Sequence, residues 1–132
     1  MPYRIHINKE ISALEFSSLM ESAGWGSDYS EELVQRSLAA YPFVAHARSK
    51  SGVLLGYVSA FSDRAFSTML GELVVHPEAR RKGIGLALLS AVEAEFTGVP
   101  VYVKTLGEAK YFFAACGYRA PAVEMQVLFK RN

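Results

Sequence analysis

The sequence is poor in the features that mark disulfide-bonded, metal-binding and nucleic-acid-binding proteins. It has one cysteine, Cys116, so it cannot form an internal disulfide, and it lacks the residue spacing of a metal site. Its 14 basic and 13 acidic residues give a net charge of +1, whereas a general nucleic-acid binder would be strongly basic. These absences predict a protein with no metal and no nucleic-acid partner.

Long apolar runs are also absent. No window reaches the length of a membrane span, and the first six residues lack the apolar core of a signal peptide. The 132 residues are 51% hydrophobic and 12% aromatic, which suits one globular domain over residues 1–132. We therefore expect a single-domain cytoplasmic protein that does not enter a membrane.

The apolar periodicity predicts alternating strands and helices. Strands are expected at residues 3–7, 43–48, 53–61, 66–75, 99–104 and 123–130, and helices at 12–23, 30–41, 84–96 and 108–116. The strands between residues 43 and 75 should form an antiparallel meander. The strand–helix–strand unit that follows implies a right-handed crossover with locally parallel pairing. The expected order is β-α-α-β-β-β-α-β-α-β.

Residues 72–86 are the most informative segment. An apolar strand at 73–75 is followed by the three cations at 80–82, then by Gly83 and Gly85 at the start of an apolar-periodic helix. The first N–H groups of a helix have no partner within it, and the helix dipole favours negative charge there. Glycines let a phosphate approach the backbone because they have no Cβ. The segment predicts a phosphate or pyrophosphate site.

Two familiar phosphate motifs do not fit this segment. A Walker loop would need Gly-x-x-x-x-Gly-Lys-Ser/Thr, and a Rossmann fingerprint would need a third glycine where the sequence has Leu88. A basic turn that begins an ordinary helix is the alternative interpretation.

The pattern Arg80-x-x-Gly83-x-Gly85, after a Val-His-Pro-Glu lead-in, resembles the acyl-CoA signature of the GCN5-related N-acetyltransferases (GNATs). The run at residues 109–119 also resembles the family's last helix, and the resemblance covers about residues 43–129. It implies an α/β fold with a mixed, mostly antiparallel sheet of six to seven strands and about four helices. It also implies acetyl-CoA as the cosubstrate.

The resemblance assigns the cofactor to two groups of residues. In the family, the strand before the phosphate loop holds the pantetheine, and the amides of the loop and helix start hold the pyrophosphate. The corresponding residues here are Leu73, Val74, Val75, Arg80, Arg81, Lys82, Gly83, Ile84, Gly85 and Leu86.

The acceptor side offers two acidic candidates. Glu72 is a candidate base or amine-orienting acid, because a free alkylamine is protonated at neutral pH and must lose a proton before it attacks. A salt-bridged or solvated strand glutamate is the alternative. Asp63 is the second candidate, to attract a cationic amine, although aspartate also favours turns. Ser62-Asp63 and Glu72 match acidic positions of an arylalkylamine-type (serotonin-like) subgroup of the family.

The loop at residues 24–30 supplies two aromatic candidates. Trp25 and Tyr29 could wall the acceptor site, and ordinary packing is the alternative. The resemblance implies an acetyl-CoA-dependent N-acetyltransferase of a small-molecule amine or a peptide N-terminus, present as a monomer or homodimer. The family's general-acid tyrosine falls on Phe113, which has no proton to donate. A catalytically silent acyl-CoA sensor that regulates a partner protein is therefore the alternative function.

Overall fold

The computed structural model describes residues 2–132 in two compact units, 2–102 and 103–132. The first contains β1 (Tyr3–His6), α1 (Ala13–Ser22), α2 (Glu31–Ala40), β2 (Phe43–Ser49), β3 (Leu54–Ser62), β4 (Thr68–Val75), the 3-10 helix η1 (Pro77–Ala79), α3 (Ile84–Glu95) and β5 (Val101–Tyr102). The second contains α4 (Ala109–Ala115). Up to α4, the expected order of elements is confirmed.

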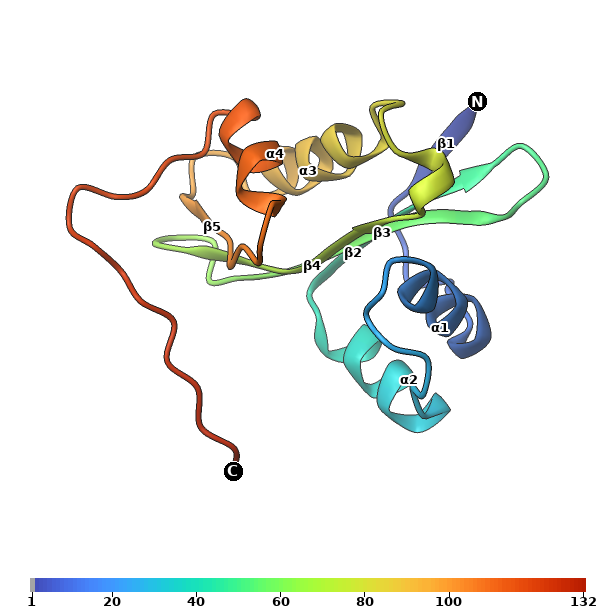
Figure 1. Cartoon of the computed structure of the whole chain (residues 1–132). Helices are drawn as coiled ribbons and strands as arrows, with labels where there is room; N and C mark the ends of the chain where they lie inside the picture. The colour runs from blue at the N-terminus through green and yellow to red at the C-terminus, as the bar shows by residue number, and fades with distance from the viewer. Residues whose placement is uncertain (1) are drawn as a thin grey trace. The chain divides into compact units, whose positions relative to one another are not determined.

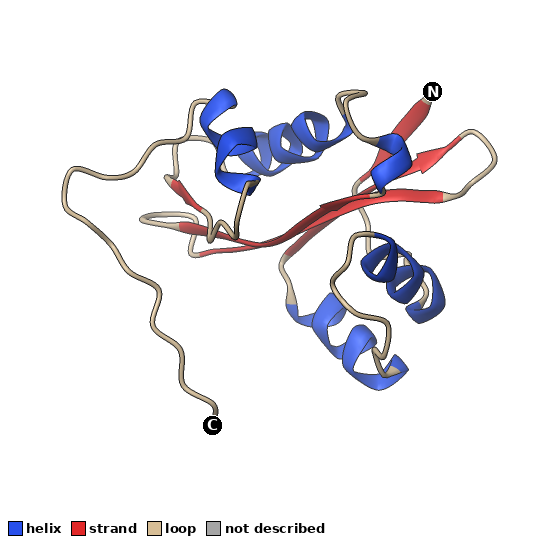
Figure 2. Cartoon of the chain, in the orientation of Figure 1, coloured by secondary structure: helices blue, strands red, loops and turns tan. Residues whose placement is uncertain are grey.

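The strands of the first unit form one mixed sheet in the order β1-β2-β3-β4-β5. All neighbours are antiparallel except β4 and β5, which pair in parallel through Thr68 and Met69. Both the predicted meander and the predicted parallel pairing after the crossover are therefore confirmed. Helix α3 lies on one face of the sheet, and α1 and α2 lie on the other (Figures 1 and 2).

Side-chain caps place the first two helices where the sequence predicts them. The Ser12 hydroxyl accepts from the amide of Glu15 at 3.1 Å, and the Glu15 carboxylate accepts from the amide of Ser12, so the pair forms a capping box. Ser30 caps α2 by accepting from the amide of Leu33 at 3.0 Å. Pro42 follows the end of α2, since proline disfavours helical geometry at the residue before it.

The two faces of the sheet are packed differently. On the α1 and α2 side, a core of mostly apolar side chains surrounds the fully buried Tyr57, and it includes Phe16, Leu19, Met20, Val34, Leu38 and Val74. On the α3 side, a Cβ at Gly56 would lie only 3.0 Å from Ile84 and 3.1 Å from Leu88. A glycine at this position therefore lets α3 pack closely against β3.

The pairing of β3 with β4 contains a bulge that shapes the centre of the sheet. Val58 lies opposite Leu73 and Ala60 lies opposite Leu70, so the single Ser59 faces two residues of β4, Gly71 and Glu72. An extra residue of this kind disturbs the alternation of side chains along its strand. Glu72, two residues from Val74, faces the same side of the sheet as Tyr57 and Ser59, and the bulge brings Gly71 to that side as well.

Two expectations about strands are wrong. The predicted strand at residues 123–130 does not form, so the described sheet has five strands and not six to seven. The segment has the apolar pattern of a strand, but a strand is stable only in a sheet, and these residues have no ladder partner. Their apolar side chains, including Val127 and Phe129, are exposed. The strand predicted at 99–104 is also shorter, with only the two residues of β5.

The second unit consists of α4 and an extended tail. Helix α4 ends before Gly117, whose φ of +92° suits glycine at a helix C-terminus. The ring of Phe113 packs edge-on against those of Phe112 and Tyr118, at centroid distances of 5.1 and 5.5 Å. Across residues 2–132, no helix combines the length and apolarity that a membrane crossing requires.

A bidentate ion pair joins α1 to the sheet and makes the stability of the fold depend on pH. Arg48 donates to both oxygens of Glu15, at 2.6 and 3.1 Å, and also to the carbonyls of Glu10 and Gly52. The hydrogen bond from Arg48 is the main reason that the pKa of Glu15 falls from 4.5 to about 2. Because the folded-state pKa is depressed, the stabilisation is complete above about pH 4.5 and is lost as the pH falls toward 2.

We expect this loss to appear in the free energy of unfolding. Between pH 5 and 2, the free energy of unfolding of wild type should fall by about 1–2 kcal/mol more than that of Glu15→Gln. This difference is smaller than the full pKa shift implies, because Glu15 is partly solvated. Denaturant unfolding across this pH range measures the difference. Glu32→Gln is the control, since Glu32 pairs with Arg36 on the exposed face of α2. Parallel curves for wild type and Glu15→Gln would contradict the prediction.

Candidate active site

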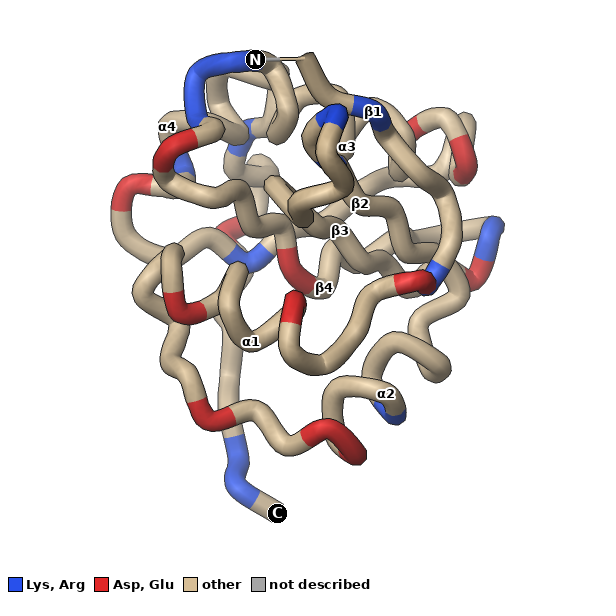
Figure 3. Tube along the Cα trace, turned by 90° about the vertical axis from the view of Figure 1, so that its right-hand side faces the viewer, with Lys and Arg blue, Asp and Glu red and all other residues tan. Residues whose placement is uncertain are grey.

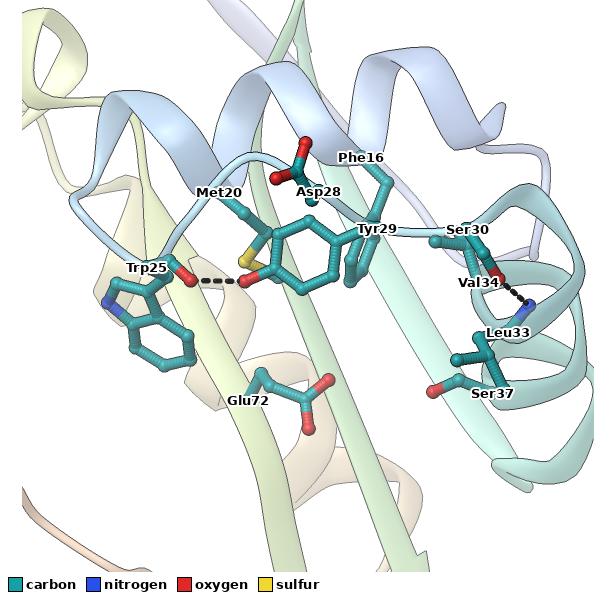
Figure 4. A pocket seen from close by; sticks show the side chains of 10 residues that line it. All are labelled: Phe16, Met20, Trp25, Asp28, Tyr29, Ser30, Leu33, Val34, Ser37 and Glu72. Carbon is teal, nitrogen blue, oxygen red and sulfur yellow. Dashed lines mark hydrogen bonds between the residues drawn. The ribbon is translucent and has the colours of Figure 1, made fainter.

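A cavity of about 300 Å³ lies between α1, α2 and β4 in the first unit. Its lining consists of Phe16 and Met20 from α1, Trp25, Asp28, Tyr29 and Ser30 from the following loop, Leu33, Val34 and Ser37 from α2, and Glu72 from β4. Figure 4 shows Glu72 across the cavity from the loop, with Trp25 at one side and α2 at the other. The site is thus a largely apolar pocket that contains a strand carboxylate.

The loop wall is fixed by local contacts. The Tyr29 hydroxyl donates to the carbonyl of Trp25, and the Tyr29 ring packs edge-on against Phe16 at 5.4 Å. The amide of Trp25 donates to the carbonyl of Met20 at 2.9 Å. Trp25 is about half exposed, which leaves part of its ring available to a ligand.

The Glu72 carboxylate is surrounded by hydroxyl groups. Tyr41 donates to Oε2 at 2.8 Å, whereas Tyr57 and Ser59 approach Oε1 at 3.3 and 3.5 Å. The amide of Glu72 donates to the Ser59 hydroxyl at 3.1 Å. All three neighbours are hydrogen-bond donors to the carboxylate.

Both tyrosines remain protonated through the neutral pH range. Burial, followed by the hydrogen bond to Glu72, raises the pKa of Tyr41 to about 12. Burial also raises the pKa of Tyr57. Each hydroxyl therefore acts toward Glu72 as a hydrogen-bond donor.

The turn before α3 has the geometry of an anion site. Arg81 and Gly83 both have positive φ angles, +65° and +84°, and Gly83 occupies the N-cap position of α3 without a side-chain cap. The first amides of α3 have no partner within the helix. The cations at 80–82 are exposed, and they form the longest continuous blue stretch of the tube in Figure 3. The backbone and the charges together fit a phosphate.

The outer edge of β4 is paired over only part of its length. Its parallel neighbour β5 pairs with Thr68 and Met69 alone. No described strand pairs on that edge with the residues from Leu70 to Val75. The backbone of 73–75, which the resemblance assigns to the pantetheine, therefore lies at a strand edge without a described neighbouring strand, where the Val75 carbonyl accepts from Nε of Arg80 at 3.2 Å.

The structure brings some of the predicted acceptor residues together and separates another. Trp25, Tyr29 and Glu72 line the same cavity, although Glu72 lies more than 40 residues after the loop that contains the other two. Asp63 is exposed in the turn between β3 and β4 and does not line the cavity. Its Oδ1 accepts from the amides of Ala65, Phe66 and Ser67, and these bonds lower the pKa of Asp63. The geometry of Asp63 is that of a turn residue.

Sequence reasoning did not identify the hydroxyl groups around Glu72. In the sequence, Tyr41 ends an expected helix, and Tyr57 and Ser59 lie within an expected strand. The alternation of β3 places Tyr57 and Ser59 on one face, which was a usable signal. Glu72 shares that face, because Tyr57 lies opposite Val74 and Glu72 is two residues before Val74 on β4.

Comparisons with known proteins agree on one family. A family model for the acetyltransferase (GNAT) domain matches residues 39–120. A mycothiol acetyltransferase from Kineococcus radiotolerans is 35% identical over 100 residues, which cover 74% of this chain and 33% of that protein. The chain thus spans about a third of the length of this curated relative.

Solved structures share the fold at low sequence identity. A GNAT-family acetyltransferase from Streptococcus pneumoniae has a TM-score of 0.81 at 18% identity, and the match covers 99% of this chain and 100% of that one. Glucosamine-6-phosphate N-acetyltransferase from Arabidopsis thaliana has a TM-score of 0.73 at 14% identity, and the match covers 98% and 100% of the two chains.

Proposed function

The chain belongs to the GCN5-related N-acetyltransferase (GNAT) family, and from this premise we propose that it transfers an acetyl group from acetyl-CoA to a small amine held in the cavity. One observation supports a small cationic amine as the acceptor. Glu72 projects into a pocket whose other walls are mostly apolar, and none of the described residues that line it is Lys, Arg or His. Such a pocket suits a cation with an apolar body.

The charge around the pocket supports a cationic acceptor. Residues 10–40, which include α1, α2 and the loop between them, contain six carboxylates and one arginine. Figure 3 shows red segments along this part of the chain. Even with Arg48 paired to Glu15 and Arg36 paired to Glu32, acidic groups outnumber basic ones here, and a locally negative surface raises the concentration of cations near the cavity. It disfavours acceptors that carry a phosphate or an additional carboxylate.

The chemistry assigned to Glu72 is proton removal. When bound, acetyl-CoA would supply the acetyl group as a thioester: the amine nitrogen would replace sulfur on the carbonyl carbon, and the CoA thiolate would leave and take up, directly or through water, the proton that the attacking nitrogen loses. An ammonium ion has no lone pair with which to attack, so Glu72 accepts its proton directly or through a water. Trp25 and Tyr29 orient the body of the amine in this proposal. Asp63 has no part in it, because its oxygens belong to a turn.

The residues present fit the cofactor at two places. The uncapped start of α3, with Gly83 in a left-handed conformation and the cations Arg81 and Lys82 beside it, would bind the pyrophosphate. The outer edge of β4 at Leu73, Val74 and Val75 would bind the pantetheine. Ile84, Gly85 and Leu86 contribute backbone amides from the first turn of α3.

Turnover of an amine panel tests the proposal. Acetyl-CoA is incubated with phenylethylamine, tryptamine, putrescine, glutamate, glucosamine 6-phosphate and a peptide with a free N-terminus, and thiol release is followed. We expect thiol release that depends on the amine, with kcat/KM at least about 10-fold higher for the two arylalkylamines than for the acidic acceptors. Burial of the aromatic ring favours the arylalkylamines, and repulsion between carboxylates disfavours the acidic acceptors. Together these effects account for a difference in kcat/KM of at least this size.

Two results would oppose the proposal in different ways. Faster turnover of the acidic acceptors would contradict the assignment of the cavity. Acetyl-CoA binding by calorimetry without turnover of any amine would favour the acyl-CoA sensor, which the phenylalanine at position 113 motivates.

A further inference from the structure

We propose that Tyr41 is a positioning residue for the acceptor site, whose hydroxyl holds one oxygen of Glu72 and leaves the other to receive the proton of the amine. The proposal rests on the role of Glu72 given above. It adds a residue that lies outside the cavity lining and acts only through Glu72.

The two oxygens of Glu72 are held unequally. The bond from Tyr41 to Oε2 is 2.8 Å long, within the usual range for a hydroxyl donor to a carboxylate. The contacts of Tyr57 and Ser59 with Oε1 are 3.3 and 3.5 Å long, so they are weak. Oε2 is therefore held by the stronger bond, whereas Oε1 is held by two weak ones that a new donor can displace.

The backbone and packing of Tyr41 prevent its ring from moving freely. Tyr41 is the C-cap of α2 and has φ −68° and ψ 128°, the extended conformation that the following Pro42 favours. Its ring packs on Phe61 with a centroid distance of 4.3 Å. The hydroxyl is thus brought to Glu72 by a chain segment that is already fixed.

Gly71 gives the Tyr41 ring its space. A Cβ at position 71 would lie 2.6 Å from Cε1 of Tyr41 and 2.5 Å from Oγ of Ser59. The bulge places this position on the same side of the sheet as Glu72, directly before it in the chain. A glycine is therefore needed at 71 for Tyr41 and Ser59 to reach the carboxylate together.

Holding the carboxylate by one oxygen has a chemical consequence. A carboxylate whose side-chain torsions are free to rotate presents an oxygen to the amine for only part of the time. A carboxylate that is held in place stays in the reactive orientation. The Tyr41 hydroxyl, which stays protonated with a pKa of about 12, cannot compete for the proton of the amine. It holds Glu72 without acting as a second base.

The experiment compares Tyr41→Phe, which removes the hydroxyl and keeps the ring, with wild type. We expect kcat for phenylethylamine to fall about 10- to 100-fold, the range for a hydrogen bond to a charged group, while the KM for acetyl-CoA is unchanged. Tyr102→Phe on β5 is the control, because it makes the same chemical change at an exposed tyrosine outside the site.

A second measurement does not depend on turnover. With ¹³C-labelled glutamate, the Glu72 carboxyl resonance at neutral pH should shift in Tyr41→Phe, because the carboxylate loses its shortest hydrogen bond. The pH–rate profile of Tyr41→Phe should differ from that of wild type as well. Adding Tyr41→Phe to Glu72→Gln should change kcat less than about 3-fold, since the two residues act as one unit.

The possible outcomes separate this inference from the proposed function. If Glu72→Gln is slow and Tyr41→Phe matches wild type in kcat and pH profile, the inference is wrong and the function stands. An unmoved Glu72 resonance in Tyr41→Phe also overturns the inference, whatever the rate. If Glu72→Gln reacts like wild type, both Glu72 as a base and Tyr41 as its positioning residue are overturned.

Discussion

Glu72→Gln should lower kcat for the acceptor amine by about 10²–10⁴, the usual range for loss of a general base. The amide cannot accept the proton of the amine, so the reaction is left to the small fraction of free amine in solution. Acetyl-CoA affinity should be unchanged, because the turn before α3 and the outer edge of β4 do not involve this side chain. Steady-state kinetics and calorimetry of the purified variant measure the two quantities.

The pH dependence makes this prediction sharper. The difference in kcat between wild type and Glu72→Gln should shrink as the pH rises toward the pKa of the amine, near 10, because solvent then removes the proton instead. Asp28→Asn is the comparison, since Asp28 is the other carboxylate of the cavity and lies in the exposed loop. It should raise the KM for the amine more than it lowers kcat. Parallel pH–rate profiles with equal kcat would remove Glu72 from the mechanism.

Gly83→Asp should abolish acetyl-CoA binding, with an affinity loss of at least about 100-fold. The substitution places a negative charge at the start of α3, where the helix dipole and the cations at 80–82 favour an anion. It also forces a side chain into a conformation with a φ of +84°. Isothermal calorimetry with acetyl-CoA measures the loss.

A side chain added at a residue with a left-handed backbone conformation introduces strain, and this effect needs a separate control. Gly98→Asp supplies it, because Gly98 has a φ of +82° and open space around it but follows the other end of α3. Gly85→Glu supplies the charge inside the first turn of α3, at a glycine without a positive φ. Binding should be lost in Gly83→Asp and Gly85→Glu and kept in Gly98→Asp. Equal affinity in all three folded variants would refute the assignment of the pyrophosphate site.

Local chemistry explains which parts of the fold the sequence predicts. Ser12 and Glu15 cap α1 through bonds between residues three apart, and Gly83 begins α3 after a run of cations. These signals act within a few residues, so they survive in any tertiary context. The loop between β4 and α3, and the family that it resembles, were therefore readable from the chain alone.

The tail shows the limit of that reasoning. Val123, Met125, Val127 and Phe129 alternate with mostly polar residues in the way a strand does, yet residues 119–132 contain no strand. The alternation indicates which face of a strand would be buried. The backbone hydrogen bonds that stabilise the strand must come from a partner strand. The pattern alone therefore could not decide whether this strand forms.

The sequence by itself determined the order of the elements through α4, the start of α3 as the candidate anion site, and Glu72 as the acid to consider. Only the tertiary structure decided what surrounds that acid. The loop of Trp25 and Tyr29 lies more than 40 residues before Glu72, and Tyr41 is 31 residues before it, so their meeting depends on how α2 crosses the sheet. The bulge at Gly71 and Glu72 arises from a register shift against Ser59, a property of two strands together and of neither alone.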